Sequence, residues 1–229
     1  MKNMGIKLKI ILTVLPIVVF LLLYATILLK DSYNDNSDMK TTMNITETRG
    51  VLRKTVHELQ ILRGYSSQYI VSKGKEGKSD LTDQRAKIDK CYDELVHAYD
   101  TSNTKFPNEV KDLYKEVIDE LAKRNNHNDK VDNNNSNFYK NMEFYTRIIQ
   151  KLNQLRRLLN LGVQSRELSS LYDAIDAIAY IKEQTAEQRT TGVAGLRMGK
   201  FDNELHERFI AITSNIEEAA IDSAIRPTA

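Results

Sequence analysis

Apolar residues in the first half of the chain recur at alternating steps of four and three, which is the spacing of one face of a helix. The clearest case includes the stretch ELQILRGYSSQYI, residues 58–70. Its face, extended backwards, consists of Leu52, Val56, Leu59, Arg63, Ser66 and Ile70. This pattern predicts a helix that packs against other helices and carries an arginine, then a serine, on its packed side.

Similar patterns predict that the rest of the chain is a series of helices with short breaks. The expected helices cover about residues 38–72, a stretch from near 80, 110–121, 138–160, 166–198 and 203–224. The polar stretch RNNHNDKVDNNNSN, residues 124–137, is expected to be an exposed loop. No stretch shows the period of two that indicates a strand. We therefore expect an all-α, up-and-down antiparallel bundle with long first and penultimate helices.

The predicted helix over 166–198 repeats the arrangement of the first. Its seam is Leu168, Leu171, Ile175, Ile178, Lys182, Thr185, Arg189, Gly192 and Leu196. Like Arg63, Arg189 has a small residue three positions on and an apolar one seven positions on. Neither arginine has an acid three or four positions away on its own helix, so each needs a partner from elsewhere. Two guanidinium groups facing one cleft would bind a small planar oxyanion bidentately.

Two alternatives to an oxyanion site fit the same arginine positions. Each arginine could face a carboxylate of a neighbouring helix or extend to the bundle surface, as in a purely structural helical stalk. A chemoreceptor-type four-helix bundle that binds a carboxylate or an amino acid at a dimer interface is the second alternative.

Twenty residues without a charge, 10–29, precede the bundle and are long enough to span a bilayer as a helix. Lysines precede this run and aspartates follow it, so the positive-inside rule places the start in the cytoplasm. The run is too long for a cleaved signal peptide, and no A-x-A-like site follows it. The expected organisation is a cytoplasmic N-terminus (1–9), a transmembrane anchor (10–30), a connector (31–45), a helical domain (46–226) and a tail (227–229) that ends before a second span.

Composition excludes several classes of function. The 33 basic and 31 acidic residues balance to +2, which does not indicate a nucleic-acid binder. The histidines lack the spacing of a metal site, and no catalytic arrangement of nucleophile, base and acid can be assembled. We therefore expect no enzyme, no metal and no cofactor.

The two arginine segments resemble a known family. LQILRGYSSQYI and KEQTAEQRTTGVAGLRMGKFD are similar to the signature segments of the bacterial nitrate- and nitrite-sensing (NIT) domain. The resemblance covers roughly residues 45–225 and implies an all-helical domain that senses nitrate or nitrite as the extracytoplasmic input of a membrane receptor. The sequence departs from the family pattern at Leu62 and Thr185, where a glutamate and a glycine are common.

The resemblance also implies which residues bind the ligand. Arg63 and Arg189 correspond to the anion-binding arginines of the family, and neighbouring residues match its motifs. The full expected site is Arg63, Arg189, Ser66, Gly64, Gly192, Thr190 and Lys182. Nitrate or nitrite is the expected ligand, with the cell membrane and a second copy of the chain as partners. Ligand binding would neutralise two facing cations and pass a helix displacement to the membrane.

Overall fold

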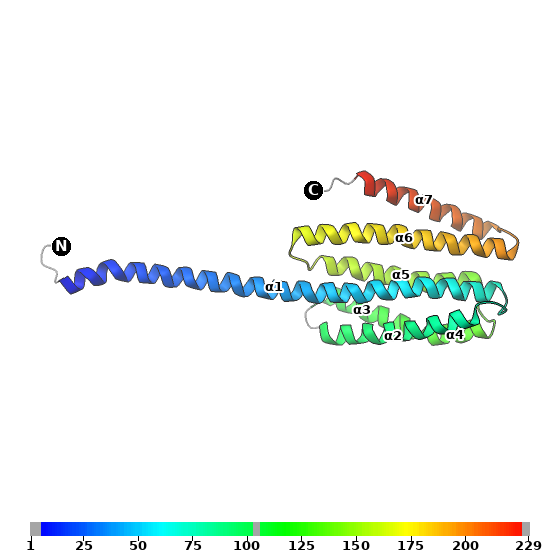
Figure 1. The fold of residues 1–229 in the computed structure, drawn as a ribbon, viewed down its shortest axis with the longest axis horizontal. Helices are drawn as coiled ribbons and strands as arrows, with labels where there is room; N and C mark the ends of the chain where they lie inside the picture. Colours follow the sequence, from blue (N-terminus) through cyan, green and yellow to red (C-terminus); the bar gives the residue numbers. More distant parts are fainter. Residues whose placement is uncertain (1–5, 103–105, 226–229) are drawn as a thin grey trace. The chain divides into compact units, whose positions relative to one another are not determined.

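Seven helices make up the part of the chain that the computed structural model describes, residues 6–102 and 106–225 (Figure 1). Within these ranges only the backbone is described at residues 6–18, 31, 34–38, 102 and 223–225. The helices are α1 (Ile6–Val71), α2 (Lys78–Ser102), α3 (Asn108–Ala122), α4 (Arg124–Asp132), α5 (Phe138–Asn160), α6 (Arg166–Met198) and α7 (Asn203–Ile225). No strand occurs in the described ranges, in agreement with the predicted all-α class. The bounds of α5 and α6 are those that the apolar pattern predicts.

Contacts divide the chain into two units after Met43. In the first unit the apolar side chains described between Val19 and Leu29 are exposed. Among the residues with described side chains, no helix is both long and apolar enough to cross a bilayer. Residues 10–18 of the expected anchor lie outside that set, so the transmembrane anchor over 10–30 stays a prediction.

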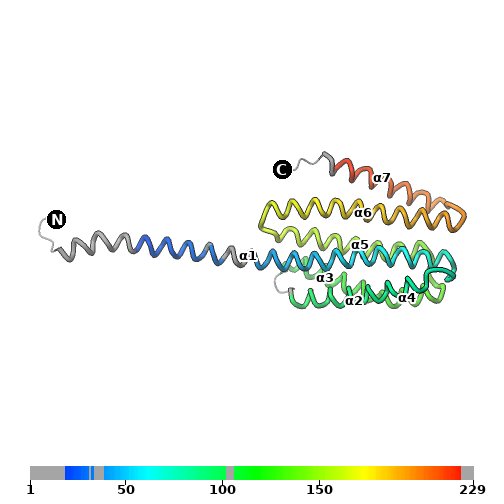
Figure 2. Tube along the Cα trace, in the orientation of Figure 1, coloured from blue at the N-terminus to red at the C-terminus, as the bar shows by residue number. Residues whose placement is uncertain are grey.

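The long helices of the second unit alternate in direction along the chain, as expected for an up-and-down bundle (Figure 2). The part of α1 in this unit and α6 run in the same direction, because Arg49 bonds Asp176 and Arg63, further along, bonds Glu183. Side chains at increasing positions of α1 therefore meet increasing positions of α6. This parallel pair holds both arginine segments.

The main hydrophobic core joins α1, α2, α3, α5 and the start of α6. The seam predicted for α1 is buried along most of its length, with Leu52, Leu59, Arg63 and Ser66 all 0% exposed. A second, smaller apolar cluster joins α5, α6 and α7 through Phe138, Met142, Ala194 and Leu205. Between these two clusters the surfaces of α5 and α6 that face each other are polar.

The expected loop at 124–137 is wrong for most of its length, because residues 124–132 form α4. Arg124, His127 and Val131 are spaced by one helical turn and are buried. The His127 ring stacks on Phe144 with centroids 4.1 Å apart, and the Arg124 guanidinium lies 4.3 Å from the centre of an aromatic ring on α2. Side chains with apolar bodies and polar tips form the buried face of α4. A prediction from composition alone counts these residues as polar and places the segment in solvent.

The expected orientation of α6 is also wrong. Most of its predicted seam faces outward, with Leu171 55%, Ile178 68% and Leu196 79% exposed, whereas Leu168 and Ile175 near its start pack against the main core. The inward side carries mostly polar residues instead; those buried on α6 are Tyr172, Glu183, Gln184, Glu187, Thr191, Ala194 and Gly195. Periodicity identifies the apolar face of a helix, but it does not say which face the rest of the same chain covers.

Candidate functional site

Arg63 is the central residue of the candidate site. Its side chain is 0% exposed, and Nη1 donates hydrogen bonds to Glu183 Oε1 at 2.6 Å and to Thr146 Oγ1 at 2.9 Å. Gln60 Nε2 donates to the other oxygen of Glu183, also at 2.6 Å. The carboxylate that the cation needs therefore comes from α6 and is itself held by two residues of α1.

Only one side of the Arg63 guanidinium is satisfied. Nε and Nη2 are buried and have no hydrogen-bond partner among the described residues. In a planar guanidinium these two nitrogens form one edge with two parallel N–H donors, the geometry that grips a carboxylate, a nitrate or a phosphate bidentately. This edge has the donor geometry that a planar oxyanion requires, and it lies in the interior of the bundle.

Two further side-chain atoms, Thr191 Oγ1 and Arg208 Nε, are buried without a partner in the described part of the chain. Glu187 connects them to Arg63. Glu187 Oε2 lies 3.9 Å from Arg63 Nη1, its Oε1 accepts a hydrogen bond from Arg208 Nη2, and Thr191 follows one turn later on α6. Arginines of α1 and α7 thus both lie near the Glu187 carboxylate of α6.

Burial raises the pKa of the Glu183 carboxyl above its ordinary value, because desolvation disfavours its charged form. The charge and hydrogen bond of Arg63 and the bond from Gln60 act in the opposite direction, and the nearby charge of Glu187 adds to the rise. Desolvation is the largest of these effects, so we infer that Glu183 holds a proton more readily than an exposed glutamate.

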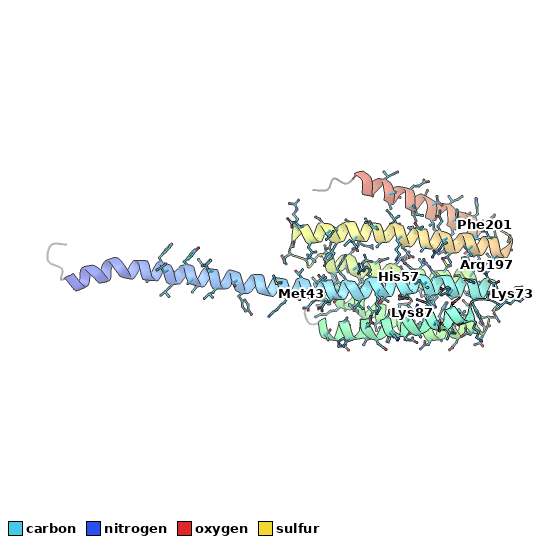
Figure 3. The ribbon with its side chains drawn as sticks, viewed as in Figure 1. Met43, His57, Lys73, Lys87, Arg197 and Phe201 are labelled. Carbon is cyan, nitrogen blue, oxygen red and sulfur yellow. The ribbon has the colours of Figure 1, made fainter. Side chains whose placement is uncertain are left out.

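Arg189 lies in a different environment from Arg63. It is exposed, makes no ion pair with any described residue, and lines a groove of about 320 Å³ between α1 and α6. Gly64 and Thr190 line the same groove, whereas Arg63 does not. Arg197, at the end of α6 (Figure 3), also lines it and pairs with Glu76 in the loop after α1. In this structure the two arginines therefore do not face one cavity.

The remaining expected residues are distributed over both sides of α1 and α6. Ser66 is buried, but its hydroxyl donates to the carbonyl of Leu62 at 2.6 Å. Lys182 is exposed, with Nζ 3.3 Å from a ring nitrogen of His57, a residue of α1 (Figure 3). Gly192 lies where α6 meets α7, and a side chain there would contact the ring of Phe209 at 3.4 Å.

Sequence reasoning missed the residues that surround Arg63 on the other helices. They are Thr146, Glu187, Thr191 and Arg208, together with the pairing role of Glu183. One signal was available, because Glu183, Glu187 and Thr191 follow at steps of four on the side of α6 opposite its apolar seam. A polar stripe of this kind normally faces solvent, so the pattern alone does not mark it as a site.

Comparisons with known proteins identify the family of the chain. Residues 54–228 match a family described as nitrate and nitrite sensing, NIT. No curated protein matches the chain. The solved structure titled "Structure of the NasR transcription antiterminator" has a similar fold, with a TM-score of 0.78, 16% identity, and coverage of 84% of this chain and 53% of that one. This chain thus spans about half the length of the NasR chain, and at this identity the similarity concerns the fold alone. The chain belongs to the NIT family of nitrate- and nitrite-sensing domains, as its two arginine segments predicted.

Proposed function

We propose that nitrate or nitrite binds at the unpaired edge of Arg63. The observation that carries this proposal is that Nε and Nη2 are both buried without an acceptor among the described residues. A buried donor left unsatisfied costs on the order of 1–3 kcal/mol, and more when it is charged. A planar oxyanion supplies two oxygens in the plane of the guanidinium and removes this cost. Membership of the NIT family supports nitrate or nitrite as that anion.

The surrounding groups complete the proposed shell. Thr191 Oγ1 and Arg208 Nε are the further donors for the third oxygen, and both lack a partner in the described residues. Glu183 and Glu187 hold Arg63 and Arg208 in position while the ligand is absent. Glu183 also places its carboxylate close to the bound anion, so nitrate binding depends on the protonation of Glu183, whose pKa is raised by burial.

Arg189 is the proposed second cation of the site. Its guanidinium is free of ion pairs with the described residues and lies in the groove that separates α1 from α6. A displacement of α6 along α1 would bring Arg189, with Thr190, Gly192 and Lys182, toward an anion held by Arg63 and beside Gly64 of α1. Packed helices respond to such changes by sliding or rotating as units. This displacement, carried by α1 toward the membrane, is the proposed signal.

The proposed sensor acts as a homodimer. The exposed Leu171, Ile178 and Leu196 of α6 support this, because exposed apolar side chains on a helix offer a surface for a second helix. A structural stalk is less well supported. It fits the pairing of Arg63 with Glu183 and the exposed position of Arg189, but it gives no role to the buried Nε and Nη2 of Arg63.

The proposed location of the bundle is outside the cytoplasm, on a membrane anchor at 10–30. A reporter enzyme that works only outside the cytoplasm, fused after Lys30 in a bacterial host, should be active, because the charge asymmetry of residues 2–38 places that point outside. A cytoplasm-specific reporter at the same position serves as the control. Activity of the cytoplasmic reporter alone would overturn the proposed topology without affecting the anion site.

Calorimetric titration of the purified chain with nitrate, nitrite, chloride and acetate tests the site itself. Nitrate or nitrite should bind, and Arg63→Lys should weaken binding by roughly ten- to a hundredfold, because lysine keeps the charge but lacks the planar pair of donors. Arg189→Lys should also weaken nitrate binding if a displacement of α6 brings Arg189 into contact with the anion.

Arg53→Lys is the matched control, since Arg53 is an exposed arginine of α1 that lines neither cavity. This variant should bind nitrate as the unaltered chain does. Acetate binding stronger than nitrate binding would favour a carboxylate receptor. Equal affinity of Arg63→Lys and the unaltered chain would exclude the proposed Arg63 site.

A further inference from the structure

A polar cavity of about 370 Å³ lies between α5, α6 and α7, apart from the groove beside Arg189. Its lining is polar or charged except for Ala211 and Ile212 of α7. Cavities of this size fall in the range that holds small organic ligands, and this one is far larger than a four-atom anion requires. The inverted orientation of α6, with its polar side inward, produces this lining.

One corner of the cavity carries an excess of buried positive charge. Asp176 Oδ1 accepts hydrogen bonds from both Arg49 and Arg156, which are 6% and 3% exposed. Two buried guanidinium groups thus share one carboxylate. Arg157, the next residue of α5, also lines the cavity and makes no ion pair with any described residue. This corner therefore has two positive charges more than Asp176 neutralises, which favours an anionic group.

The Asp176 carboxylate at this corner also lacks one hydrogen-bond donor. Asp176 Oδ2 is buried and has no hydrogen-bond partner in the described part of the chain. A ligand that satisfies the whole corner must present a carboxylate to Arg156 and Arg157 and, next to that carboxylate, a charged donor to Asp176. An α-amino acid has this combination, with an ammonium and a carboxylate on one carbon.

The rest of the cavity suggests the kind of side chain. Beyond the Asp176 corner its lining includes the amides of Gln150, Gln184 and Asn215, beside the charged groups of Glu183, Glu187 and Arg208. Asn215 Nδ2 donates to Gln184 Oε1 at 3.2 Å, so these amides can exchange one such bond for a bond to a ligand. Amides both donate and accept, and they therefore match a polar, uncharged side chain.

We propose that this cavity is a second ligand site of the chain, which binds a free α-amino acid with a polar side chain. The ligand carboxylate pairs with Arg157 and Arg156, and its ammonium pairs with Asp176. Arg63 itself lines neither this cavity nor the groove, but Thr146, Glu183, Glu187 and Arg208 of the candidate site also line this cavity. The residues proposed to bind the amino acid are none of those proposed to bind nitrate.

Thermal unfolding of the purified chain with L-glutamine as the probe tests the proposal. Millimolar glutamine should raise the Tm in a saturable way. Propionate and propylamine, which carry one charged group each, should bind at least tenfold more weakly. Arg157→Gln should lower the affinity for glutamine roughly ten- to a hundredfold by removing a charge-assisted bond.

Arg157 is exposed, so its replacement is expected to leave the fold intact. Arg147→Gln is the matched control on the same helix, because Arg147 lies outside the cavity lining and should not affect glutamine binding. Arg157→Gln should reduce the response to glutamine and leave the response to nitrate unchanged, which separates the two sites. The proposal is overturned if no common α-amino acid raises the Tm at millimolar concentration, or if Arg157→Gln binds glutamine as tightly as the unaltered chain.

Discussion

Replacing Arg63 by alanine is expected to lower the free energy of unfolding by about 3–5 kcal/mol, the typical cost of removing one partner of a buried ion pair. Alanine would leave Glu183, which is 4% exposed, without its cation and would leave a cavity where α1, α5 and α6 meet. Arg63→Lys should be less destabilising, because the positive charge remains. Denaturant unfolding of both variants without nitrate measures the difference.

Arg189→Ala is the control for this effect. Arg189 is exposed and unpaired among the described residues, so its removal should change the unfolding free energy by no more than ~0.5 kcal/mol. If Arg63→Ala and Arg189→Ala proved equally stable, the buried pair between Arg63 and Glu183 would not be formed in solution. The proposed anion edge would then lose its structural basis.

Nitrate affinity is expected to fall as the pH rises. Burial already raises the pKa of Glu183 above its ordinary value of 4.5, and a bound anion beside it would raise that pKa further. Nitrate binding then takes up a proton. The affinity should be level below the pKa of Glu183 in the free chain and fall by up to about tenfold per pH unit above it. It should level off again above the pKa of the nitrate-bound chain.

The raised pKa of Glu183 also affects the unfolding free energy of the chain without nitrate. A carboxyl whose folded pKa is raised contributes stability below its ordinary pKa, and this contribution is lost as the pH rises through the raised value. Glu183→Gln retains a hydrogen-bonding side chain of the same shape but cannot titrate. Its nitrate affinity should vary much less with pH. An equal pH dependence in this variant, or an affinity that rises with pH, would contradict proton uptake by Glu183.

Most of the fold could be predicted from local patterns. The bounds of α5 and α6 follow from apolar spacing flanked by polar and glycine breaks, and the buried seam of α1 is the one that its spacing predicts. α4 could not be predicted in this way. Its buried face consists of an arginine, a histidine and a single valine, and the rings that cover these residues belong to helices distant in sequence.

Of the two arginines expected in the candidate site, the sequence predicted the environment of only one. Arg63 stands out because it occupies a seam position and has no acid three or four positions away on its own helix. The sequence therefore predicts that Arg63 is buried and paired with residues of other helices. Arg189 satisfies the same criteria and is nevertheless exposed, since its seam faces away from the bundle. The partners of Arg63 come from α5 and α6, some 80 and 120 positions along the chain.

The sequence by itself determined that the chain is all helical, which face of each long helix is apolar, and that two arginine segments mark a NIT domain. Local preferences and the 3.6-residue period decide these features, so they need no knowledge of neighbours. Only the tertiary structure decided that α6 turns its polar side inward, that Glu183 and Glu187 lie beside Arg63, and that one guanidinium edge stays unpaired among the described residues. Whether a charged side chain can be buried depends on the free energy of its interactions with all of its partners. Those partners come from helices that meet only in the folded chain.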